Sequence, residues 1–155
     1  MNRYVREYIK CESSPAYFIN EYVQIYDALA CVWIPFRLWG FQFEALRTFQ
    51  ESQLSIALKA RQNGFTWIAL SLTLWLSLFR PAFTALLFSK RDDEAKYILG
   101  DERFKGIYQR LPDYLRAREV TIDNEHEFGL CNGSIVSALP TTAGESYTVG
   151  LVVGD

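Results

Sequence analysis

The stretch Leu54–Leu70, with the sequence LSIALKARQNGFTWIAL, constrains the fold of this chain more than any other part. It begins as an apolar run typical of a buried strand, continues as a short polar loop and opens a helix at Thr66. At such a junction, backbone N–H groups and the positive end of the helix dipole both favour a bound anion. We therefore predict a phosphate-binding loop. Its residues are Lys59, Ala60, Arg61, Gln62, Asn63, Gly64, Phe65 and Thr66.

The loop matches the phosphate-loop pattern G-x-x-x-x-G-K-[ST] only in part. Gly64 and Thr66 stand at the second glycine and at the hydroxyl position, whereas Phe65 replaces the lysine and Lys59 replaces the first glycine. The loop pattern alone does not decide the function.

The chain ends with a second signal, the apolar run from Thr148 that delivers Asp155. In a parallel α/β sheet, the carboxyl end of a strand is where ligands bind. A carboxylate there and the hydroxyl of Thr66 could hold Mg²⁺ from two sides. The two signals are independent, and together they predict a nucleotide-phosphate site.

A third candidate is Gln42, which lies beside aromatic residues 17 positions ahead of Lys59. The glutamine amide offers an acceptor and donors that can read the N6 and N7 edge of adenine. The alternative is a surface glutamine next to a core cluster.

Composition limits the other possibilities. Half of the 155 residues are apolar and 22% are charged, which is typical of a globular domain. The net charge of −2 gives no global signal for nucleic-acid binding. A local basic excess over Arg103–Arg118 is expected to be a solvated face, and it is also where a polyanion contact would be sought. Three scattered cysteines favour a reducing compartment, without a disulfide or metal framework.

Two further features bear on the membrane and on catalysis. Gln62–Phe79 carries no charge, but its fully apolar part, Trp67–Phe79, is short for a bilayer span and suits a buried helix. The charged Met1–Lys10 has no apolar core of a signal peptide. The single histidine, His126, has no suitable nucleophile near it, which argues against Ser/His or Cys/His catalysis.

These patterns predict an α/β fold with a mostly parallel sheet of the P-loop NTPase type, flanked by helices. Ala82–Phe88 is expected to be a buried parallel strand, because it follows a helix at βαβ spacing. The Asn132-Gly133 turn predicts an inserted β-hairpin. We expect an N-terminal helical segment over residues 1–34 and a partial ATPase domain over residues 35–155, incomplete at the C-terminus.

Five motifs, in this order, make the chain similar to the ATPase domain of the large subunit of tailed-phage terminases, the motors that package viral DNA. They are Ser14–Ile19, Pro35–Trp39 leading to Gln42, Leu58–Thr66, Asn132–Pro140 and Leu151–Asp155. The resemblance covers nearly the whole chain, and the Lys-Ala-Arg-Gln-x-Gly-x-Thr loop is its most specific part.

The resemblance implies ATP and Mg²⁺ as cofactors. It also implies that Gln42 reads adenine and that Lys59 or Arg61 supplies the phosphate-binding charge. Thr66 and Asp155 would hold the metal. The intact protein would hydrolyse ATP in the cytoplasm of the bacterial host to move double-stranded DNA, working with a portal protein and a small terminase subunit, as a homo-oligomeric ring and without a membrane. The chain by itself is expected to have little or no activity.

Two other functions remain open. A helicase-like ATPase also uses an upstream glutamine, although the usual loop lysine is missing here. Phe65 and Glu145 instead favour a non-catalytic prophage remnant that acts only as a folded interaction module.

Overall fold

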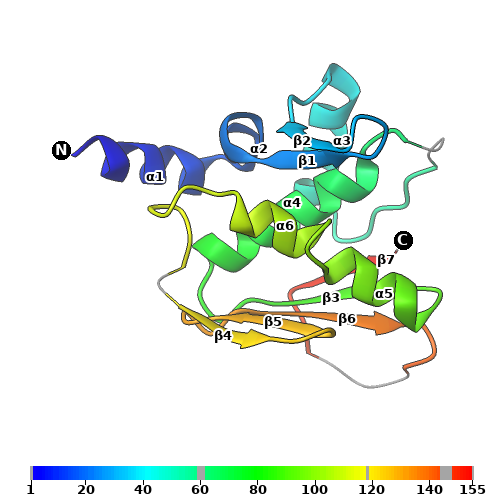
Figure 1. The fold of residues 1–155 in the computed structure, drawn as a ribbon. Helices are drawn as coiled ribbons and strands as arrows, with labels where there is room; N and C mark the ends of the chain where they lie inside the picture. The colour runs from blue at the N-terminus through cyan, green and yellow to red at the C-terminus, as the bar shows by residue number, and fades with distance from the viewer. Residues whose placement is uncertain (1, 59–61, 118, 144–147, 155) are drawn as a thin grey trace.

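The computed structural model describes residues 2–58, 62–117, 119–143 and 148–154. Its centre is a sheet of five strands in the order β4-β5-β6-β3-β7 (Figure 1). The strands are β3 (Thr84–Ser89), β4 (Val120–Asp123), β5 (Glu127–Leu130), β6 (Ile135–Pro140) and β7 (Leu151–Gly154).

The sheet is mixed, so the prediction of a mostly parallel sheet of the P-loop NTPase type is wrong. Strand β3 runs parallel to β6 and to β7, as predicted for this strand, but β4–β5 and β5–β6 are antiparallel pairs. The antiparallel pairs arise because tight turns join successive strands. Gly133, at φ +86°, turns the chain between β5 and β6. The hairpin was predicted as an insertion, but it belongs to the main sheet, because its second strand, β6, is also the parallel neighbour of β3.

Three helices, α4 (Phe65–Phe79), α5 (Asp92–Leu99) and α6 (Phe104–Gln109), lie over one face of this sheet (Figure 1). In the described part of the chain no helix covers the opposite face. Helix α4 confirms the helix predicted from Thr66 to Phe79. It is apolar on nearly all sides because it is buried between the sheet and the N-terminal elements.

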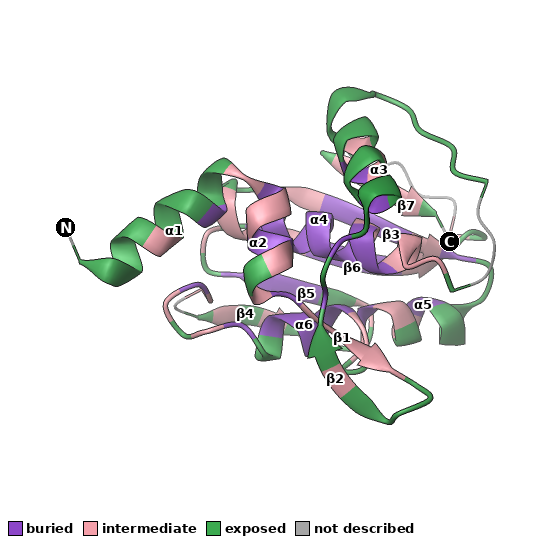
Figure 2. Cartoon of the chain, turned by 90° about the horizontal axis from the view of Figure 1, so that it is seen from above, coloured by how far each residue is buried: buried purple, intermediate pink, exposed green. Residues whose placement is uncertain are grey.

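The N-terminal part consists of helices α1 (Arg3–Ser13) and α2 (Pro15–Tyr22), the antiparallel strands β1 (Gln24–Asp27) and β2 (Val32–Pro35), and helix α3 (Gly40–Glu51). Figure 2 shows α1 as a largely exposed helix that extends from the body, and α4 as a buried one. The predicted boundary after residue 34 falls inside β2, and the division into two domains stays a prediction.

The prediction of a buried strand at Leu54–Leu58 is wrong. The described residues there form no strand, and the side chains of Leu54, Ile56 and Leu58 are 82%, 89% and 103% exposed. An apolar alternation forms a strand only where the segment pairs with a sheet edge and one of its faces is covered, and the described residues here are exposed and pair with no strand.

No helix in the described ranges is both long enough and apolar enough to cross a membrane.

Candidate functional site

Two cavities meet at the N-terminus of α4. The larger has a volume of about 790 Å³ and the smaller of about 230 Å³, and Phe65 and Thr66 line both. A volume of several hundred Å³ is typical of sites for small molecules and cofactors. The first turn of α4 is therefore the centre of the candidate site.

The larger cavity is lined by Gln42 and by the described residues of the predicted phosphate loop. Gln42 lines it together with Gln62, Asn63 and Gly64 of the predicted loop. Gly64 is the N-cap of α4, with φ +75° and ψ 8°, and its carbonyl accepts the N–H of Ile68 at 3.0 Å. A left-handed conformation at this position favours glycine, which explains why the loop turns into the helix here.

Gln42 is buried and ties helix α3 to the loop. Its Oε1 accepts the backbone N–H of Trp39 at 2.8 Å, which caps the start of α3, and its Nε2 donates to the carbonyl of Asn63 at 3.1 Å. An amide nitrogen carries two hydrogens, so one donor remains for another partner. A contact with adenine that used both the oxygen and the nitrogen of this amide would compete with these two bonds, whereas a contact through the remaining N–H would not.

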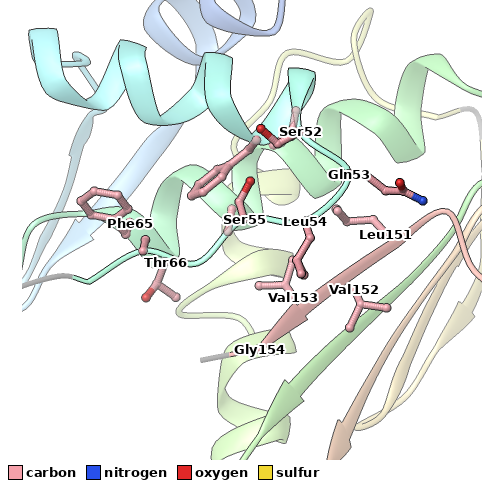
Figure 3. Close-up of a pocket in the computed structure, with 14 residues that line it drawn as sticks. Ser52, Gln53, Leu54, Ser55, Phe65, Thr66, Leu151, Val152, Val153 and Gly154 are labelled. Atoms are coloured by element: carbon pink, nitrogen blue, oxygen red, sulfur yellow. The ribbon is translucent and has the colours of Figure 1, made fainter.

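The smaller cavity brings Thr66 together with the carboxyl end of β7. Thr66 and Gly154 both line it, and Ser52, Gln53, Leu54 and Ser55 line it from another side (Figure 3). Gly154 immediately precedes Asp155 in the chain. Lys59, Ala60, Arg61 and Asp155 lie outside the described residues, so their predicted roles stay predictions.

Phe65, which replaces the usual lysine, packs toward helix α3. Its ring stacks on Phe41, with centroids 6.2 Å apart and planes inclined by 28°, and meets the edge of Phe49 at 6.5 Å. These contacts account for a large apolar side chain at a loop position where a cation is common.

The basic segment that the sequence analysis singled out separates into different roles. Lys105 lies 2.6 Å from Asp123 and also donates to the carbonyl of Asn124, while Arg116 pairs with Asp113. Arg103 instead lines the larger cavity. Sequence reasoning missed Arg103 as a site residue, because nothing in its immediate neighbours distinguishes it from the other cations of this segment.

Mg²⁺ prefers oxygen ligands, and the predicted ones are Thr66 and Asp155. Thr66 supplies a hydroxyl at the helix start, and the cavity that it lines reaches the residue before Asp155. Within the described residues, no three His, Cys, Asp or Glu side chains gather in a metal-binding arrangement. The donor set of Thr66 and Asp155 fits a hard cation that prefers oxygen.

No model of a known protein family matches the chain, and no curated protein matches it significantly. The similarity to large terminase subunits therefore stays a prediction from the motifs.

Proposed function

We propose that this chain binds ATP with Mg²⁺ and is the nucleotide-binding part of a DNA-packaging ATPase of the terminase type. One observation carries the proposal. Gln42 and the loop residues 62–66, which are far apart in the sequence, line the same cavity of about 790 Å³. Independent sequence signals thus meet at one site of the right size, at the start of a helix.

In this proposal the base lies near Gln42, and the phosphates lie along the loop at the N-terminus of α4. Lys59 or Arg61 would neutralise phosphate charge, and Thr66 and Asp155 would hold Mg²⁺. Bound there, the cation would neutralise charge on the phosphate oxygens. The intact protein would couple ATP hydrolysis to translocation of double-stranded DNA in the host cytoplasm, with a portal protein and a small terminase subunit as partners and as a homo-oligomeric ring.

Titration calorimetry with ATP·Mg²⁺ tests the binding step. We expect binding by the chain, and a loss of affinity on the order of tenfold or more for Lys59→Ala, because a hydrogen bond to a charged group contributes about 1.5–3 kcal/mol. Lys90→Ala removes an exposed lysine that lines neither cavity, and it should leave the affinity unchanged. Absence of ATP binding, or equal effects of the two substitutions, would contradict the proposed roles.

A second candidate, a folded module without nucleotide chemistry, is favoured by a different observation. The amide of Gln42 already has two backbone partners, which is sufficient to explain why a glutamine is buried there. This alternative predicts no detectable heat with ATP·Mg²⁺, whether or not Lys59 is present.

A further inference from the structure

Arg103 is the N-cap residue of α6, and two aromatic side chains from other helices hold its guanidinium. The guanidinium carbon lies 4.5 Å from the ring centroid of Trp67 in α4 and 5.1 Å from that of Tyr97 in α5. Cation–π contacts use the face of the guanidinium group and leave its N–H donors, which point outward in the plane, available for other partners. The stacking therefore orients Arg103 without using its hydrogen-bonding edge.

Among the described residues, Arg103 forms no ion pair, whereas Arg37, Arg47, Arg91 and Arg116 each pair with a carboxylate. Two further charged residues line the same cavity, Asp27 and Arg37. Arg37 pairs with Glu21 at 3.3 Å. One carboxylate oxygen of Asp27 accepts the backbone N–H groups of Leu29 and Ala30, which fixes the turn between β1 and β2. Arg103 is thus the cation of this cavity that has no described acidic partner.

The position of Arg103 relates it to the loop. Trp67 follows Thr66 directly in the first turn of α4, so the ring that carries the guanidinium belongs to the same turn as the predicted phosphate site. The cavity lining includes Gly64, Thr66 and Trp67 as well as Arg103. A planar guanidinium matches two oxygens of a phosphate group with parallel hydrogen bonds.

We propose that Arg103 is a phosphate-binding residue of the larger cavity and supplies a cation from outside the loop. This inference rests on the proposed function for the identity of the ligand, a nucleoside triphosphate. It adds a residue that the loop motif does not contain, and it explains why an arginine is held in position by two rings at a cavity wall.

The test compares three probes by titration calorimetry: ATP·Mg²⁺, inorganic tripolyphosphate and adenosine. We expect Arg103→Ala to weaken binding of ATP·Mg²⁺ and tripolyphosphate on the order of tenfold or more, and to leave adenosine binding unchanged. Arg103→Lys keeps the charge but loses the paired hydrogen bonds, so it should lie between Arg103→Ala and the unmodified chain.

Arg110→Ala is the matched control. Arg110 also lies over an aromatic ring, at 3.7 Å from the centroid of Trp33, but it does not line the cavity. Its removal costs a cation–π contact of the same kind, and binding of all three probes should be unchanged. Thermal unfolding of each variant establishes that it is folded, and Arg103→Lys decides the question if Arg103→Ala does not fold.

The outcomes separate this inference from the proposed function. If Arg103→Ala and Arg103→Lys leave the affinity for ATP·Mg²⁺ unchanged, or weaken adenosine equally, Arg103 is only a packing residue and the inference is overturned. If the chain binds tripolyphosphate through Arg103 but gains nothing from the nucleoside, the inference stands and the proposed ATP site fails. If it binds neither phosphate probe, both are overturned.

Discussion

Gly64→Ala tests the geometry at the centre of the site. Gly64 has φ +75°, a conformation that an L side chain rarely adopts, and a Cβ atom built there would lie 2.8 Å from Nε2 of Gln42. The ring of Phe36 lies 3.7 Å away and does not obstruct it. The substitution therefore strains the backbone and displaces the buried amide that ties α3 to the loop.

The magnitude follows from these two effects. The left-handed conformation costs a residue with a Cβ roughly 1 kcal/mol. Displacing the Gln42 amide removes its bond to Asn63, and a buried polar group left without a partner costs about 1–3 kcal/mol. We expect Gly64→Ala to lower the free energy of unfolding by about 2–4 kcal/mol, a large share of the roughly 5–15 kcal/mol that stabilises a typical domain.

Urea denaturation followed by tryptophan fluorescence measures this loss, and Gly40→Ala provides the control. Gly40 begins α3, and a Cβ atom there meets nothing within 4 Å, so the alanine should be neutral or slightly stabilising. A double-mutant cycle with Gln42→Ala isolates the clash, because the double variant should lose less than the sum of the single losses. Equal stability of the Gly64 and Gly40 variants, or strict additivity in the cycle, would refute the reasoning.

Two further predictions concern the rest of the fold. Ser71→Ala should raise the free energy of unfolding by about 1 kcal/mol in urea denaturation, because the buried hydroxyl of Ser71 has no partner among the described residues. Ser77→Ala is the control, because the hydroxyl of Ser77 donates to a helix carbonyl at 2.8 Å. This variant should not gain stability, and a gain of equal size would contradict the argument. The pKa of Glu7 is lowered to about 2 by hydrogen bonds from three side chains. The donors are Lys10, Tyr17 and Tyr22. Because the folded-state pKa lies below the ordinary value of 4.5, this contribution is present above about pH 4.5 and is lost as the pH falls toward 2. Thermal melts across that pH range should show that the melting temperature falls more steeply for the unmodified chain than for Glu7→Gln. Parallel curves of melting temperature against pH would exclude this role of Glu7.

The local sequence predicted the elements that are buried on most sides. Helix α4 is apolar over its length and is covered on most sides, so its hydrophobicity alone was sufficient to place it. Strand β3 has parallel neighbours on both edges, and its continuous apolar run reflects that burial. Leu54–Leu58 has a comparable run but forms no strand, because pairing depends on a neighbouring edge that the local sequence does not specify. The mixed sheet has the same cause, since strand order and direction depend on contacts between distant segments.

The residues of the candidate site show the same difference between what the local sequence indicates and what depends on distant contacts. The loop and Gln42 became candidates because their residue types carry chemistry at a recognisable spacing. Arg103 did not, because its proposed role depends on rings from two other helices. The contacts of Gln42 limit the role that its motif suggests. Its carbonyl caps α3 and its amide holds the loop, so reading adenine with both groups would require Trp39 and Asn63 to lose a partner. A base contact through the second N–H requires no such loss, and it would leave the tie between α3 and the phosphate loop intact while the nucleotide is bound.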